Sequence, residues 1–133
     1  MPHPDRTLAT VPGAPAPNFN GYSLVVRATG HRIHLAGWMG EDPETAKVVE
    51  GGCEAQTEQI MANIKTCLEA AGSSLEKVVL RRSYFLDIKR DVPIVARVWD
   101  KWAPGLKPVS TAVQVSGLAK EGAVIEIEVE AEV

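Results

Sequence analysis

The sequence predicts a two-layer α+β domain in which two helices cover one face of a mixed β-sheet. Apolar residues recur at spacings of three and four in two separate segments, as on one face of a helix. Runs rich in β-branched residues precede, separate and follow these segments, and the last run alternates between apolar and acidic residues. The resulting order is β-β-β-α-β-α-β-β, which favours helices packed on one face of a sheet. At 133 residues, the chain is expected to form one domain, residues 1–133, with a flexible N-terminus at residues 1–6.

Three short strands are predicted before the first helix. Residues 7–11 form the first, and the segment that follows, residues 12–20, is too rich in proline for regular structure because each proline removes a backbone donor. Residues 22–28 and 32–36 are the next two strands. A three-residue connection that contains Gly30 separates them, which is typical of a hairpin.

The first helix is predicted over residues 53–71. Gly72 follows it, where helices commonly end in a left-handed residue. The second helix is expected to start at Asp91 as N-cap, with Pro93 in its first turn, and to end at Pro104. The apolar faces of the two helices are Ile60, Met61, Ile64, Cys67, Leu68 and Ala71, and Ile94, Val95, Val98, Trp99 and Trp102.

The remaining strands are predicted at residues 78–86, 110–115 and 124–133. In the last strand, alternate residues from Ile125 to Val133 should face the core, and four glutamates should face the other way. We expect Glu130 and Glu132 to be solvated. Glu126 is either solvated as well or points into a pocket, where desolvation would raise its pKa into the range of a useful general acid or base.

The charge balance argues against nucleic acid as a partner. The chain has 14 Lys and Arg against 17 Asp and Glu, a net charge of −3, and no clustered basic face of the kind that phosphate binding needs. No stretch approaches the ~18 consecutive apolar residues of a membrane span, and the N-terminus lacks the apolar centre of a signal peptide. We therefore expect a cytoplasmic protein that binds no membrane, with Cys53 and Cys67 reduced.

Few cysteines and histidines in the sequence are candidates for catalysis or metal binding. Cys67 is expected in the core and Cys53 near a helix N-terminus, where it is either structural or activated as a thiolate. His31 and His34 have no neighbouring ligand cluster, so neither a metal nor a cofactor is expected.

Three further side chains admit more than one role. Arg81 and Arg82 are adjacent on a strand and therefore point to opposite faces. One of them is expected to form an intersubunit salt bridge or to anchor an anion. Trp38 either lines a flat apolar pocket or packs in the core.

Six segments, in the correct order, resemble the sequence pattern of the RidA/YjgF family of enamine/imine deaminases. Residues 21–23 resemble its G-P-Y-S element and residues 33–37 its F-x-S-G strand end, while residues 54–72 and 78–87 resemble its first helix and the strand after it. Residues 108–115 and 125–128 resemble its P-A-R-S-x-V-x-V and V-E-I-E segments. The resemblance implies a chorismate-mutase-like fold and a homotrimer with three pockets between subunits. It also implies that Tyr22 lines the pocket and that Glu126 positions water or transfers a proton.

The same comparison shows departures from the family pattern. Ser110 stands in place of the arginine that binds the substrate carboxylate, Ala96 in place of a common asparagine, and Trp38 in place of a common glutamine, while Thr111 keeps the next hydroxyl position. Serine cannot replace the charge and the two parallel bonds of a guanidinium. We therefore expect a larger, more apolar or less anionic ligand, unless Arg81 or Arg82 supplies a displaced anchor.

The function expected from these features is hydrolytic deamination of a small enamine, imine or related unsaturated metabolite. Glu126 is the expected acid/base group, and Tyr22, Ser110 and Thr111 are expected to orient the substrate or water. The alternatives are a tautomerase or hydratase that uses the same pocket, and a non-catalytic trimer that binds a metabolite or a protein. Ribonuclease activity is disfavoured by the acidic charge.

Overall fold

The computed structural model of the chain describes residues 7–10, 12, 25–26 and 30–133. Its elements, in chain order, are β1 (Thr7–Leu8), β2 (Val25–Val26), β3 (Arg32–His34), α1 (Gly52–Ala70), the short 3₁₀ helix η2 (Leu75–Lys77), β4 (Val78–Phe85), α2 (Ile88–Trp102), β5 (Val109–Gln114) and β6 (Ile125–Glu132).

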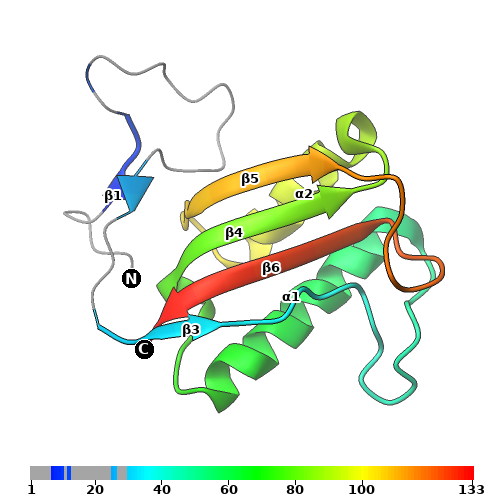
Figure 1. Cartoon of the computed structure of the whole chain (residues 1–133), viewed down its shortest axis with the longest axis horizontal. Coiled ribbons are helices and arrows are strands. Elements are labelled where there is room, and N and C mark those ends of the chain that lie inside the picture. Colours follow the sequence, from blue (N-terminus) through cyan, green and yellow to red (C-terminus); the bar gives the residue numbers. More distant parts are fainter. Residues whose placement is uncertain (1–6, 11, 13–24, 27–29) are drawn as a thin grey trace.

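The main sheet has four strands in the order β3-β6-β4-β5 (Figure 1). Strand β6 pairs antiparallel with both of its neighbours, whereas β4 and β5 are parallel and are joined through α2. A crossover of this length is what parallel pairing requires. Among the described residues, β2 pairs with β1 and β3 pairs with β6, so the hairpin expected between residues 22–28 and 32–36 is not found there.

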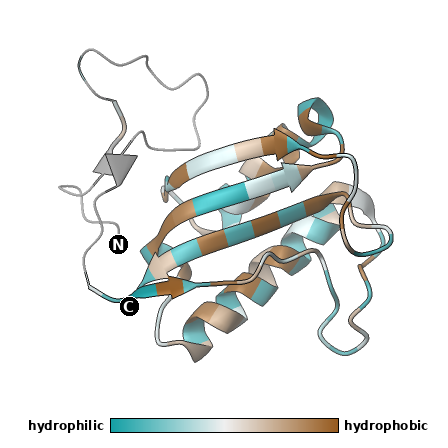
Figure 2. Ribbon diagram, in the orientation of Figure 1, coloured by the Kyte–Doolittle hydropathy of each residue, from teal (hydrophilic) through white to brown (hydrophobic). Residues whose placement is uncertain are grey.

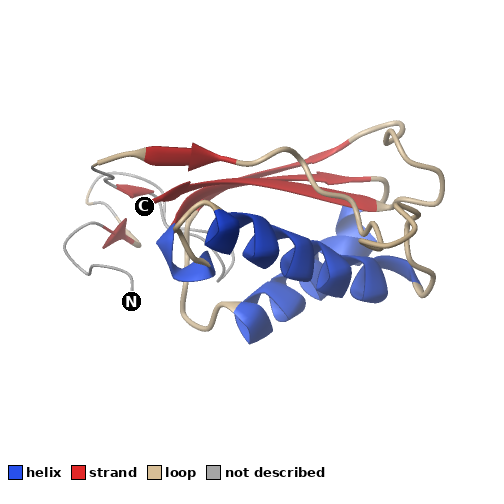
Figure 3. Cartoon of the chain, turned by 90° about the horizontal axis from the view of Figure 1, so that it is seen from below, coloured by secondary structure: helices blue, strands red, loops and turns tan. Residues whose placement is uncertain are grey.

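Both helices lie on the same face of the main sheet, which gives two layers (Figure 3). The core between the layers is formed by the apolar face of α1, the inward residues of β6, and side chains from β4 and α2. Its fully buried members include Ile60, Met61, Ile64, Leu68, Phe85, Val98, Ile125, Ile127 and Val129. Figure 2 shows the alternation of hydrophobic and hydrophilic residues along β6 that produces this arrangement. The predicted α+β class and the predicted order of elements are therefore confirmed.

The C-terminus of α1 ends as predicted. Gly72 has a φ of +81°, and its N–H donates to the Glu69 carbonyl at 3.1 Å. The Ser73 N–H donates to the Leu68 carbonyl at 2.8 Å. This pair of bonds is the Schellman motif, which satisfies the last carbonyls of the helix and favours glycine at the left-handed position.

The start of α2 differs from the prediction. The N-cap is Asp87, whose carboxylate accepts the Arg90 N–H at 3.3 Å, and the helix begins at Ile88. Asp91 was expected to be the cap, but it is buried within the helix, where Arg90 donates to its two carboxylate oxygens at 2.9 and 3.1 Å. Pro93 therefore lies beyond the first turn. The bond that its ring removes would end at the carbonyl of Lys89, in an exposed turn that tolerates the loss.

The end of β6 also differs from the prediction. Glu132 was expected to be solvated, but it is only 6% exposed, because the strand end pairs with β3 and lies against the turn after α1, where the Ser73 hydroxyl donates to the Glu132 carbonyl. Val133 was expected in the core and is 56% exposed, because it follows the last residue of the strand.

Within the part of the chain described here, no helix has both the length and the apolar character needed to cross a membrane.

The assignment of Asp87 as the N-cap of α2 can be tested by mutation. Asp87→Ala removes the side-chain acceptor at the helix start and should lower the free energy of unfolding by about 1 kcal/mol. Urea denaturation followed by circular dichroism measures the change. Lys89→Ala, in the same exposed turn, is the control and should change it by less than about 0.5 kcal/mol. Equal losses in the two variants would contradict the assignment of Asp87 as the cap.

Candidate functional site

The sequence-predicted site residues fall into two groups on opposite faces of the main sheet. Ser110 and Arg81 are partners in the register of β5 and β4, and both point toward α2. Their neighbours Thr111 and Arg82 are also register partners and therefore point to the face that no described helix covers. We call the first side the helix side and the second side the open face.

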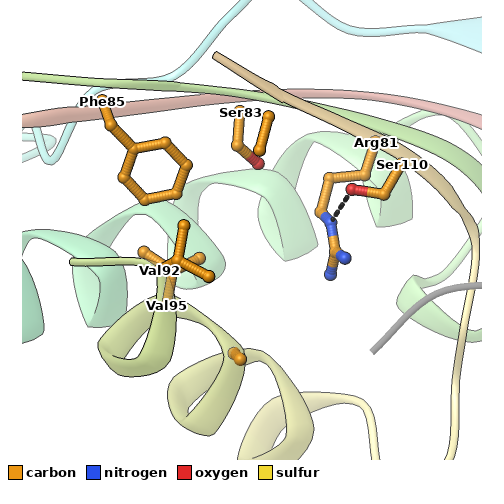
Figure 4. Close-up of a pocket in the computed structure, with 8 residues that line it drawn as sticks. Arg81, Ser83, Phe85, Val92, Val95 and Ser110 are labelled. Carbon is orange, nitrogen blue, oxygen red and sulfur yellow. Dashed lines mark hydrogen bonds between the residues drawn. The ribbon is translucent and has the colours of Figure 1, made fainter. Parts of the chain in front are cut away.

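A small pocket lies on the helix side between β4, β5 and α2 (Figure 4). Its lining combines two polar and one cationic side chain with apolar ones: Arg81, Ser83, Phe85, Val92, Val95, Ala96, Ser110 and Ala112. Its volume is about 30 Å³, which is room for only a few water molecules. The pocket of one chain is therefore large enough for a small chemical group only.

Arg81 is the charged group of this pocket. Its Nε donates to the Ser110 hydroxyl oxygen at 3.1 Å (Figure 4). Its guanidinium carbon lies 4.5 Å from the centroid of the Trp99 ring. The side chain is buried, and this burial lowers the pKa of Arg81 to about 10. The guanidinium is therefore still charged at neutral pH, and Ser110 and Trp99 hold its position.

Glu126 lies on β6 and points to the open face, opposite Tyr84 in the register with β4. It is partly buried, and burial raises its pKa, with smaller contributions from the negative charges of Glu128 and Glu41. A raised pKa makes a carboxyl group a stronger base than an ordinary one.

Gly37 provides the space for the Glu126 carboxyl group. A Cβ atom added at Gly37 would lie only 2.2 Å from Oε2 of Glu126. The carboxyl group therefore lies directly against the backbone of the segment that follows β3. Gly37 belongs to a segment that resembles the family pattern, but the sequence alone did not indicate that it accommodates Glu126.

The rest of the open face is a network of paired charges. Arg82 lies 3.4 Å from a carboxylate oxygen of Glu130 and 3.9 Å from one of Glu128. His34 Nδ1 lies 3.3 Å from the other oxygen of Glu130. The Tyr84 hydroxyl donates to Glu128, and this hydrogen bond is the largest cause of the raised pKa of Tyr84. Arg82 is therefore engaged on the open face, and Arg81 is the one of the two that lines the pocket.

The structure does not bring all of the predicted site residues together. Ala96, Ser110 and Arg81 share the pocket on the helix side. Glu126 and Thr111 are on the open face, and Thr111 is exposed there. Tyr22 lies outside the described residues.

Trp38 belongs neither to the pocket on the helix side nor to the charged network of the open face. Its backbone exchanges two hydrogen bonds with Ile127, at 2.8 and 2.9 Å, which extends the β3 edge of the sheet. Its ring packs against the hydrophobic core, and among the described residues its indole N–H has no hydrogen-bond partner. Of its two predicted roles, this geometry favours core packing.

The described cysteines and histidines do not form a further cluster of reactive or metal-ligating groups. Burial raises the pKa of Cys53 to about 11, so its thiol is protonated at neutral pH, and its Sγ lies 3.7 Å from the Thr57 hydroxyl. Within the described parts of the chain, no group of three or more His, Cys, Asp or Glu residues is placed to hold a metal ion.

Tyr84 and Glu128 are members of the open face that the sequence analysis did not single out. The signal for them was present, because Tyr84 alternates with Arg82 along one strand and Glu128 with Glu126 along another. Their contact depends on the register between β4 and β6, which the sequence does not specify.

Comparison with known proteins identifies the family. Residues 13–133 match the family model described as Endoribonuclease L-PSP. The chain is 38% identical over 115 residues to a RutC family protein of Pyrococcus horikoshii, and the match covers 86% of this chain and 88% of the relative. It is 32% identical over 122 residues to the human protein named 2-iminobutanoate/2-iminopropanoate deaminase, with 92% and 84% covered.

Solved structures agree with the sequence comparisons. The crystal structure of RidA from an Antarctic Psychrobacter species superposes on the chain with a TM-score of 0.72 at 34% sequence identity, and the match covers 98% of this chain and 97% of that one. With two helices on one face of a four-stranded mixed sheet, the chain has the chorismate-mutase-like α+β fold and belongs to the RidA/YjgF family.

Proposed function

We propose that the protein hydrolyses small imines, or the enamines that tautomerise to them, into a carbonyl compound and ammonia. The proposal is supported by membership of the RidA/YjgF family and by relatives that are named as deaminases of reactive intermediates. The observation that carries it is the partly buried carboxyl group of Glu126, whose pKa is raised on the open face of the sheet.

In this proposal Glu126 acts first as a general base and then as a general acid. Its carboxylate takes a proton from water as the water oxygen adds to the carbon of the protonated imine, which gives a neutral carbinolamine. It then returns that proton to the carbinolamine nitrogen. The C–N bond breaks to release ammonia, and the hydroxyl group loses its proton to solvent water and becomes a C=O group. A carboxyl group with a raised pKa serves both steps better than one with an ordinary pKa.

The location of the proposed site follows from the two faces of the sheet. Glu126 on the open face and Ser110 on the helix side are separated by the sheet itself, so one chain cannot place both against one small molecule. A second copy whose pocket packs near the open face of the first would bring them together. We propose that this assembly is a homotrimer with three such intersubunit sites, in agreement with the expectation from the family pattern.

Glu126→Gln tests the acid/base step. The amide keeps the size of the side chain but cannot exchange the proton, so kcat should fall by about 10²- to 10⁴-fold. Imino acids generated by an amino-acid oxidase serve as substrates, and semicarbazide traps the imine that remains. Glu69→Gln, an exposed position on α1, is the charge-matched control and should keep wild-type turnover. Unchanged turnover in Glu126→Gln would exclude Glu126 as the acid/base group.

Glu126→Gln also tests whether each site is formed by two chains. Ala96→Phe should fill the pocket on the helix side of each chain and abolish turnover without touching Glu126. If each site combines two chains, refolding Glu126→Gln together with Ala96→Phe should restore activity in mixed assemblies, up to roughly a quarter of the sites at equal mixing. No recovery in mixtures shown by native mass spectrometry to contain both chains would contradict a shared site.

The charge of Glu128 should influence the titration of Glu126. Because Glu128 contributes to the raised pKa of Glu126, Glu128→Gln should lower that pKa toward the ordinary value of 4.5. The deprotonated, basic form would then persist to lower pH. A ¹³C NMR titration of labelled glutamate carboxyl groups, assigned with Glu126→Gln, measures the shift. An unchanged or higher pKa of Glu126 in the variant would contradict the coupling.

Gly37→Ala should displace Glu126 with little effect on the fold. The new Cβ would overlap Oε2, which is the free end of a flexible side chain, so the carboxyl group should move away at small cost in stability. We expect turnover to fall at least about tenfold while the melting temperature changes by only a few degrees. Gly117→Ala, where an added Cβ meets nothing within 4 Å, is the matched control. Wild-type turnover in Gly37→Ala would show that the position of this carboxyl group is not critical.

A further inference from the structure

A second carboxylate, that of Glu41, lies near Glu126 on the segment that extends the β3 edge of the sheet. Trp38 and Ile127 are antiparallel bridge partners, so the following residue, Met39, comes opposite Glu126. The side chain of Glu41 folds back toward this point, because its carboxylate accepts the Met39 N–H at 3.3 Å. The chain therefore brings a further negative charge to the position of the proposed acid/base group.

The Glu41 carboxylate is held in this position by several contacts. The Glu41 N–H donates to the Met39 carbonyl at 2.8 Å, and the Glu41 carbonyl accepts the side-chain N–H of Asn63 on α1 at 2.9 Å. The side chain is 15% exposed. A charge that is fixed and partly shielded from water acts more strongly on its neighbours than a mobile, fully solvated one.

Lys120 is the cation that accompanies this carboxylate. It belongs to the loop between β5 and β6, which meets the loop before α1 at the end of the sheet where β6 begins (Figure 1). Its Nζ lies 3.6 Å from the Glu41 carboxylate and donates to the Ala46 carbonyl at 3.3 Å. Ala46 has a φ of +60°, which is uncommon for a residue with a side chain. The loop thus adopts an unusual conformation at the residue whose carbonyl binds Lys120.

The other charged groups around Glu126 come from the strands. On the open face, the titratable or charged side chains in the described part of the chain that surround Glu126 are Glu41, Lys120, Tyr84, Arg82 and Glu128, with His34 and Glu130 further along the row. Arg82 and Tyr84 both contact Glu128. Lys120 is the corresponding partner of Glu41, so each of the two carboxylates that act on Glu126 has a compensating group of its own.

We propose that Glu41 and Lys120 are a pair of positioning residues that together set the proton affinity of Glu126. Glu41 supplies negative charge at this position, and Lys120 moderates that charge from the neighbouring loop. The inference rests on the proposed deaminase function and adds two residues to it. The pair contacts neither water nor substrate in this proposal and acts only through Glu126.

The two halves of the ion pair should have opposite effects. Glu41→Gln removes the negative charge and should lower the pKa of Glu126. Lys120→Met leaves the Glu41 charge uncompensated and should raise the pKa of Glu126. Both substitutions break the same ion pair, so a purely structural role would affect stability in both variants without producing opposite changes in this pKa.

A ¹³C NMR titration of labelled glutamate carboxyl groups, assigned with Glu126→Gln, measures the pKa of Glu126 directly. Glu44→Gln and Lys47→Met are the matched controls, because both positions are exposed on the loop before α1, and they should leave this pKa at its wild-type value. Lys120→Arg keeps the positive charge and should also retain the wild-type value. Shifts in the same direction in Glu41→Gln and Lys120→Met, or no shift in either, would overturn the proposal.

The exposed half of the pair guards against loss of folding. Lys120 is 42% exposed in a surface loop, so if Glu41→Gln does not fold, as judged by circular dichroism, Lys120→Met alone decides. An unchanged or lower pKa of Glu126 in that variant would reject the pair.

Turnover gives a second readout and separates this proposal from the deaminase function. A general base must be deprotonated to act, so the acid limb of kcat/KM should lie at lower pH in Glu41→Gln and at higher pH in Lys120→Met than in the wild type. Opposite pKa shifts together with unchanged turnover in Glu126→Gln would support the pair and reject the acid/base role. Loss of turnover in Glu126→Gln without opposite pKa shifts would support the acid/base role and reject the pair.

Discussion

Strand β6 lies in the middle of the main sheet, between β3 and β4, and its side chains alternate between apolar residues and glutamates. Because successive side chains of a strand point to opposite faces, Ile125, Ile127 and Val129 enter the core against the helices. The same alternation directs Glu126, Glu128 and Glu130 to the open face. A one-residue slip in the pairing would bury this row of carboxylates, so the register of β6 fixes both the core and the acidic row.

Three carboxylates on one strand face would repel one another if they were uncompensated. Arg82 and His34 lie beside Glu130, Arg82 also approaches Glu128, and the Tyr84 hydroxyl donates to Glu128. Within the described part of the chain, the hydrogen bonds and ion pairs of this network do not reach Glu126, which lies at the other end of the row, against Gly37. Its pKa is therefore governed by burial and by neighbouring negative charge, and not by a cation. The network compensates most of the row, whereas burial and neighbouring negative charge raise the pKa of Glu126.

The arrangement on the helix side depends on the register between β4 and β5, which places Arg81 beside Ser110. Helix α2 contributes Trp99, whose ring lies against the guanidinium. The side chain of Arg81 is buried there, and this burial lowers its pKa to about 10. The two faces thus carry different groups, with a cation on one and a partly buried carboxyl group of raised pKa on the other. The proposed assembly uses both, because a second copy is what allows one small molecule to meet the two faces of the sheet.

The helical periods and the alternating last strand were sufficient to predict the layers and the order of elements, because burial of an apolar face is encoded locally. Local capping signals were less decisive. Gly72 was predicted correctly as the left-handed end of α1. Asp87 and Asp91 both precede an apolar helix face, and only the packing that buries Asp91 distinguishes them.

The sequence also indicated Glu126, Ser110, Arg81 and Arg82 as candidate site residues. It could not reveal which arginine faces the pocket, or that Gly37 lies against Glu126, because both depend on strand register and on contacts between segments far apart in the chain. Composition and periodicity by themselves thus determined the fold class and the alternation of faces. The tertiary structure decided which side chains meet, because a hydrogen-bonded register brings distant residues to within a few ångströms.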